Sequence, residues 1–141
     1  TGTASVNALG PLRVFGDFQM SGGVFNAGPS TQTFQGSFSQ TGGTFQPGTG
    51  EIDITGWGGS TIAVVSATHF NNLRVNKSLG ASAELRLDSA LTVDGNLSIT
   101  SSGGPTLTVV PGPYEHVLSG DFTVGSVGVA ISSGVFSFSF T

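Results

Sequence analysis

Two carboxylates two positions apart are the residues of this sequence best spaced for chemistry. Glu51 and Asp53 alternate with Ile52 and Ile54, so a strand over this segment places both carboxylates on one face. Paired carboxylates can serve as acid and base in glycoside hydrolysis, or bind Ca²⁺ in polysaccharide-degrading enzymes. A half-exposed strand shows the same alternation without any catalytic role, and we expect Glu51 and Asp53 to lie on a solvated strand face.

Few other groups could bind a metal or act as nucleophiles. His69 and His116 are the two histidines, and the sequence has no Cys and no H-x-x-x-H pattern. No G-x-S-x-G segment marks a hydrolase nucleophile. We therefore expect both histidines to be surface or loop residues, and the chain to have no catalytic site, no metal site and no bound cofactor.

Charged side chains gather in one stretch of the sequence. Arg74 and Lys77 fall on one strand candidate, and Glu84, Arg86 and Asp88 fall on the next. Opposite charges on neighbouring strands stabilise each other, so we expect these residues to form cross-strand ion pairs rather than a binding site.

The composition argues against several classes of function. Only 9% of the 141 residues are charged, and the four cations are too few to form a basic surface for nucleic acid. No apolar run approaches the roughly 20 residues of a membrane-spanning helix. The 23 Gly and 11 Phe, together with many Val, Ile and Thr, favour strands joined by tight turns. We therefore expect an all-β fold with a surface of hydroxyls, amides and backbone groups.

A repeated phrase predicts how these strands are arranged. Residues 16–28 match residues 36–48 at an offset of 20 positions, and weaker copies begin at Gly95 and Gly120. A period in this range is typical of solenoids, in which each repeat buries its apolar face against its neighbours. The sequence thus predicts a single domain over residues 1–141, a parallel β-solenoid (β-helix) with coils of about 20 residues.

Within each repeat we expect two short strands joined by a glycine corner. The pairs Gly22-Gly23 and Gly42-Gly43 supply the backbone freedom that a corner needs. Four phenylalanines are expected to point inward, with equivalent residues stacked on successive coils: Phe18, Phe25, Phe38 and Phe45. Gly-Gly pairs also suit two-residue hairpins, so an antiparallel β-sandwich is the alternative fold.

Two segments of the chain resemble a known group of proteins. Residues 70–77 and 90–99 follow the pattern FxNLxVNK…LTVxGNLxI. This pattern is similar to repeats of large secreted bacterial surface proteins, in the style of the right-handed β-helical regions of adhesins and haemagglutinin-like proteins. The likeness covers residues 14–104. The resemblance implies a β-helix that lies outside the cell or at the cell surface, and it implies no particular activity.

The leading functional hypothesis is a structural, non-catalytic subunit of an extracellular fibre or cell-surface assembly. Such a subunit would form homo-oligomers or filaments by pairing open strand edges. Two segments are candidates for these contacts, the lead-in of residues 1–12 and a terminal strand within residues 135–141, although each could instead close its own core. The candidate contact residues are Val6, Leu9, Leu12, Val135, Phe136, Phe138 and Phe140.

Two other functions stay open. The second hypothesis is an adhesin-type module that binds glycans or other surface proteins. Trp57 and Tyr114 are its candidate contact residues, because exposed aromatic rings with a polar group suit such interfaces. The third hypothesis is a polysaccharide-degrading enzyme of the β-helix type, which would need further acidic residues at matching positions on neighbouring coils.

Overall fold

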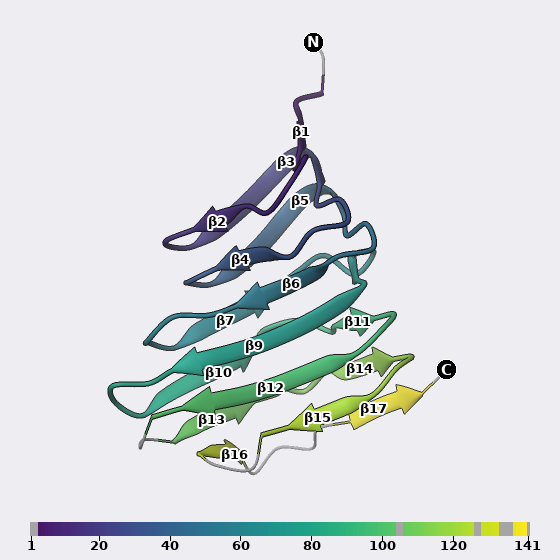
Figure 1. Cartoon of the computed structure of the whole chain (residues 1–141). Helices are drawn as coiled ribbons and strands as arrows, with labels where there is room; N and C mark the ends of the chain where they lie inside the picture. The colour runs from purple at the N-terminus through teal and green to yellow at the C-terminus, as the bar shows by residue number, and fades with distance from the viewer. Residues whose placement is uncertain (1–2, 104–105, 126–127, 133–136, 141) are drawn as a thin grey trace.

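The chain forms a parallel β-solenoid (Figure 1). The computed structural model describes residues 3–103, 106–125, 128–132 and 137–140. Within these ranges, every recorded strand pairing is parallel. The predicted solenoid is therefore confirmed, and the alternative of an antiparallel sandwich does not hold.

The described strands form three sheets, two from the first coils on and a third in the later coils. Sheet A joins, in spatial order, β1 (Ser5–Asn7), β3 (Phe18–Asn26), β5 (Phe38–Gln46), β7 (Ser60–Ala63), β10 (Ala83–Leu87), β13 (Leu107–Val110) and β16 (Val129–Ile131). Sheet B joins β2 (Arg13–Val14), β4 (Gln32–Phe34), β6 (Glu51–Ile54), β9 (Asn72–Ser78), β12 (Leu97–Ser102) and β15 (Phe122–Val124). Sheet C joins β8 (His69–Phe70), β11 (Thr92–Val93), β14 (Glu115–Leu118) and β17 (Ser137–Phe140).

The coils lengthen from the N-terminal end toward the middle of the chain. Phe18 of β3 lies opposite Phe38 of β5, 20 positions later, whereas Leu73 of β9 lies opposite Leu97 of β12, 24 positions later. The described early coils alternate between sheets A and B, and later coils add the short strands of sheet C. The 20-residue period therefore holds for the first coils, and the molecule widens away from its N-terminal end (Figure 1).

The Gly-Gly pairs lie inside long strands and not at corners between two strands. β3 and β5 each continue for nine residues through their Gly-Gly pair, and their mutual register shifts there. Gly23 and Gly43 have φ values of 76° and 75°, a conformation that favours glycine. Each expected pair of short strands is thus one bulged strand, because a bulge absorbs extra residues without ending the ladder. The corner follows at Gly28 and Gly48, which also have positive φ.

The weaker copies of the repeated phrase occupy a different sheet from the strong ones. β3 and β5, which carry the strong copies, belong to sheet A, whereas β12 and β15 belong to sheet B. The weaker copies therefore do not occupy positions equivalent to those of the strong copies. A short apolar strand after a glycine suits either sheet, and the length of the coil determines which sheet it joins.

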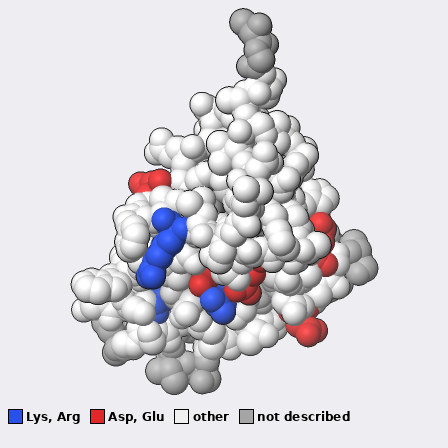
Figure 2. All heavy atoms as spheres, turned by 45° about the horizontal axis from the view of Figure 1, so that its top comes forward, with Lys and Arg blue, Asp and Glu red and all other residues white. Residues whose placement is uncertain are grey.

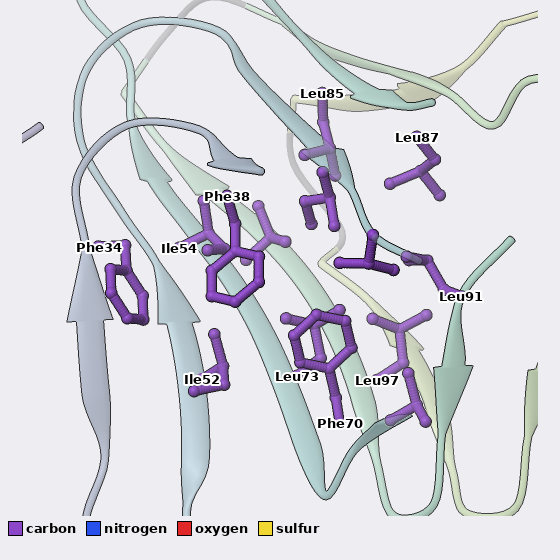
Figure 3. Packing of buried hydrophobic residues seen from close by; sticks show 14 of the residues in the cluster. Phe34, Phe38, Ile52, Ile54, Phe70, Leu73, Leu85, Leu87, Leu91 and Leu97 are labelled. Atoms are coloured by element: carbon purple, nitrogen blue, oxygen red, sulfur yellow. The ribbon is translucent and has the colours of Figure 1, made fainter. Parts of the chain in front are cut away.

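The interior is a continuous column of apolar side chains (Figure 3). The rings of Phe18 and Phe38 stack with their centroids 4.7 Å apart, and the rings of Phe25 and Phe45 stack at 5.9 Å. These contacts confirm that positions 20 apart are equivalent on successive coils. In the next coil Ile62 lies opposite Phe38, the ring of Phe70 packs against Phe38 with the centroids 5.5 Å apart, and most of the buried residues that follow are aliphatic. Each coil buries its apolar face against its neighbours, which is the source of solenoid stability.

Candidate functional site

Glu51 and Asp53 of β6 lie beside Arg74 of β9. The Arg74 guanidinium donates to the two oxygens of Asp53 at 3.1 and 2.6 Å, and its Nε lies 3.4 Å from Glu51 Oε1. The hydrogen bond to Asp53 raises the pKa of Arg74. Asp53 is buried under this contact, so the expectation of a solvated strand face is wrong for Asp53. The three side chains form an ion-pair group that joins neighbouring coils.

The second group of charges lies along β10. Arg86 is 3.7 Å from Glu84 and 3.7 Å from Asp88, and all three side chains are about half exposed. These contacts run along one strand. Arg74 forms a cross-strand ion pair, but its partners are Asp53 and Glu51 of β6 and not Glu84 or Asp88, so the expected pairing between these two strand candidates is wrong.

Lys77 points into the solenoid and is fully buried. Its Nζ donates hydrogen bonds of 2.6 Å to the Thr55 carbonyl and of 2.6 Å to Ser60 Oγ. Burial lowers the pKa of Lys77 to about 8, because desolvation disfavours the ammonium form. Ion pairing was expected for Lys77, and this expectation is wrong. The signal was in the sequence, since Lys77 shares the strand parity of Leu73 and Val75, which are both buried.

The two histidines have opposite environments. His69 is exposed, with its Nδ1 3.3 Å from Asp94 Oδ1, as expected for a surface residue. His116 is buried, which is contrary to expectation: its Nδ1 accepts from the Leu91 amide at 3.2 Å, and its Nε2 lies 3.2 Å from the Pro111 carbonyl. Burial lowers the pKa of His116. The described residues contain no group of three or more His, Asp or Glu placed to hold a metal ion.

The two candidate surface aromatics lie at different corners of the solenoid. Trp57 lies in the loop of residues 55–59, between β6 of sheet B and β7 of sheet A, and is 80% exposed. Tyr114 precedes β14, at the corner between sheets A and C, and is much less exposed. The structure does not bring the two rings together into one binding site.

The N-terminal end of the solenoid carries exposed apolar side chains. Leu9 is 97% exposed, Phe15 77% and Val6 57%, and Leu12 is also exposed. β1 pairs with β3 and β2 pairs with β4, and neither β1 nor β2 has a strand on its other side among the residues described. We refer to Val6, Leu9, Leu12 and Phe15 as the N-terminal apolar surface.

Two hollows open on the N-terminal apolar surface. One, of about 290 Å³, is lined by Val6 and residues of β3, and the other, of about 270 Å³, lies among residues 6–12 and Phe25. Three members of the surface were predicted from the sequence. Phe15 was missed, although its place between Val14 and Gly16, at the end of a strand, is typical of a corner residue that points outward.

The C-terminal strand pairs within the chain. β17 runs parallel to β14, with Phe138 opposite His116 and Phe140 opposite Leu118. The candidates Val135 and Phe136 lie outside the described residues. Among the strands described, β17 has a single neighbour, so its second edge remains a candidate for contact with another chain.

The surface has few charges (Figure 2), and most of the face shown carries neither Lys, Arg, Asp nor Glu. No helix among the described residues is long and apolar enough to cross a membrane. Comparisons with protein-family models, with curated proteins and with solved structures find no match for this chain.

Proposed function

We propose that this chain is a structural, non-catalytic module of an extracellular or cell-surface assembly, and that it associates with copies of itself through open strand edges. The observation that carries this proposal is the N-terminal apolar surface, where Leu9 is almost fully exposed beside the outer edges of β1 and β2. Strand edges with unpaired backbone groups recruit further strands, and adjacent exposed apolar side chains add a hydrophobic contribution.

The shape of the solenoid favours contact between like ends. The first coils have about 20 residues and two sheets, whereas later coils are longer and include sheet C. A narrow end stacked on a wide end would leave part of the wide coil uncovered. A two-fold contact between two N-terminal ends has matching cross-sections, and each copy presents the same residues to the other.

Growth beyond a dimer would use the opposite end. There β15, β16 and β17 are the last described strands of the three sheets, and Ile131 of β16 is an exposed apolar residue. Contact between two such ends would join dimers into a filament. The two contacts are distinct, so substitutions at one end leave the other unaffected.

The experiment compares the wild-type chain with a Val6→Lys/Leu9→Lys double variant and with Ile131→Lys. Mass is measured by light scattering over a wide range of protein concentration, and electron microscopy detects filaments. We expect filaments for the wild-type chain, dimers joined through their opposite ends for the N-terminal variant, and dimers joined through their N-terminal ends for Ile131→Lys, because charge on an edge blocks strand pairing. All three should show the same β-sheet circular dichroism.

Two results would contradict the proposal. One is a wild-type chain that stays monomeric at every concentration. The other is a Val6→Lys/Leu9→Lys variant that associates as strongly as the wild-type chain, which would place the contact elsewhere on the molecule.

A further inference from the structure

The loop of residues 55–59 holds one large aromatic side chain out in solvent. Trp57 is 80% exposed, which is unusual for a side chain whose burial would contribute so much to stability. Gly56 on one side has a φ of 99°, and a Cβ there would lie 2.3 Å from the Gln35 carbonyl oxygen. The backbone therefore reaches this conformation only with glycine before the tryptophan.

Buried contacts fix the base of this loop. Lys77 Nζ donates to the Thr55 carbonyl and to Ser60 Oγ, both at 2.6 Å, and these two residues stand on either side of the segment that carries Trp57. The Ser78 amide donates to the Gly56 carbonyl at 3.1 Å. The fully buried Lys77 thus ties the start of the loop to its end, so the indole is presented from a rigid base.

A shallow hollow of about 420 Å³ lies beside the indole. Hydroxyl groups from two successive coils line it, since Ser78 of β9 and Ser102 of β12 lie opposite each other with their Oγ atoms 3.3 Å apart. The six described residues that line the hollow are all uncharged: Trp57, Ser78, Leu79, Gly80, Ser102 and Gly103.

We propose that Trp57 and this hollow form a binding site for a neutral carbohydrate, with one sugar ring stacked on the indole and its hydroxyl groups bonded to Ser78 and Ser102. The inference goes beyond the self-association proposed above, because the site lies in a corner loop and not in the N-terminal apolar surface. A pyranose ring has an apolar C–H face, which can stack on the indole of Trp57. Its rim of hydroxyl groups can form hydrogen bonds with Ser78 and Ser102.

Other ligand classes fit this hollow less well. A charged ligand would find no opposite charge among the six lining residues, and so would lose hydration without compensation. A purely apolar ligand would cover the two serine hydroxyls without offering them a further hydrogen bond beyond the one between them, which costs affinity. The neutral sugar is therefore the occupant to which the chemistry of this surface points.

The single tryptophan makes the test direct, because all indole fluorescence of the chain comes from Trp57. Cellotetraose, mannotetraose and chitotetraose are titrated separately, with trigalacturonate as the charged comparison, and quenching of the indole by acrylamide is followed. We expect at least one neutral tetrasaccharide to shift the emission saturably and to protect the indole, and trigalacturonate to do neither.

Substitutions then assign the contact, with affinity measured by calorimetry. Trp57→Ala should weaken binding by about tenfold or more, the effect of removing an aromatic anchor, while Trp57→Phe should keep part of the affinity. Phe15→Ala is the matched control, an exposed aromatic ring at an earlier corner between the same two sheets, and should bind like the wild-type chain. The Val6→Lys/Leu9→Lys variant should also bind unchanged, so a failure of self-association leaves this test intact.

Lys77→Met tests the positioning role of the lysine. This variant should lose affinity by about threefold or more while keeping its fold, and its indole fluorescence anisotropy should fall, because the loop is no longer tied at its base. Unchanged affinity and anisotropy in Lys77→Met would overturn the role of Lys77. Binding that persists in Trp57→Ala, or the absence of any response to all three neutral tetrasaccharides, would overturn the site.

Discussion

At the scale of single residues, buried polar groups differ in how completely they are satisfied. Gln32 is fully buried and well bonded: its Oε1 accepts from the Leu12 amide at 2.7 Å, and its Nε2 donates to the Ala27 carbonyl at 2.7 Å. Lys77 is equally buried, but both of its recorded acceptors are uncharged oxygens. A buried ammonium without a carboxylate partner lowers stability, so Lys77 is a residue whose presence calls for a role beyond packing.

The first prediction concerns the pH dependence that Lys77 imposes. Its pKa falls from 10.5 in the unfolded chain to about 8 in the fold, so the unfolded chain binds the proton more tightly between these values. The free energy of unfolding should therefore rise from pH 8 to pH 10.5, with a contribution from Lys77 of up to about 3 kcal/mol. Below pH 8, Lys77 is protonated in both states and should contribute no pH dependence. Urea unfolding at a series of pH values measures this.

Lys77→Met is the control for that titration. Subtracting the unfolding free energies of the variant from those of the wild-type chain removes the contributions that the two chains share. This difference, the unfolding free energy of the wild-type chain minus that of the variant, should increase as the pH rises from 8 to 10.5. A difference that is constant over this range would show that Lys77 does not titrate with a lowered pKa.

The second prediction compares the two arginines with carboxylate partners. Arg74→Met leaves Asp53 buried without its cation, and should lower the free energy of unfolding by about 2 kcal/mol, less than for a fully buried pair because Arg74 is partly exposed. Arg86→Met removes two exposed contacts of 3.7 Å, and should cost at most about 0.5 kcal/mol. Equal costs in chemical denaturation would contradict the assignment of Asp53 as a buried, paired carboxylate.

At the scale of elements, the bulged strands β3 and β5 depend on backbone that approaches closely from the next coil. A Cβ on Gly43 would lie 2.7 Å from the Gly22 carbonyl carbon and 2.7 Å from the Gly23 oxygen, while Gly43 itself has positive φ. A Cβ on Gly22 would meet nothing within 4 Å. The two glycines belong to equivalent Gly-Gly pairs, yet only one of them is confined by both space and conformation.

The third prediction follows from that difference. Gly43→Ala should lower the free energy of unfolding by about 2 kcal/mol or more, because the substitution adds a steric clash to a strained φ. Gly22→Ala should change it by no more than about 0.5 kcal/mol. Thermal and urea unfolding of the two variants measure these costs, and a tolerated Gly43→Ala would show that the bulge is not rigid.

At the scale of the whole molecule, stability should be graded along the solenoid. Coils in the middle have neighbours on both sides, whereas the coil of β1 and β2 has described neighbours on one side only. In repeat architectures each coil is stabilised by its contacts with adjacent coils, so the end coil opens most easily. Self-association through that end would give it the missing neighbour.

The fourth prediction is therefore a concentration-dependent protection of the N-terminal end. Amide hydrogen exchange of peptides covering residues 3–14 should be fast in dilute protein and slower in concentrated protein. Peptides covering β9 and β12, in the middle of sheet B, should exchange slowly at both concentrations. Exchange of residues 3–14 that is independent of concentration would argue against an interface at this end.

Much of the fold could be predicted because the repeat is a local signal with a direct spatial meaning. Similar phrases 20 positions apart occupy equivalent sites on successive coils, and so Phe18 stacks on Phe38. The exposed Leu9, Val6 and Trp57 were also accessible from the sequence, because each stands in a strand edge or a glycine-flanked loop.

The tertiary structure alone decided which sheet each later strand joins and which charged side chain on an outer strand face is covered by a neighbouring coil. In the longer later coils sheet C is present, and the strand after Gly95 belongs to sheet B, whereas the strong copies of the phrase belong to sheet A. No local sequence pattern encodes the length of a whole coil. The burial of Asp53 likewise depends on Arg74, which approaches from another coil. Strand parity is a property of neighbours in sequence, whereas burial is a property of neighbours in space.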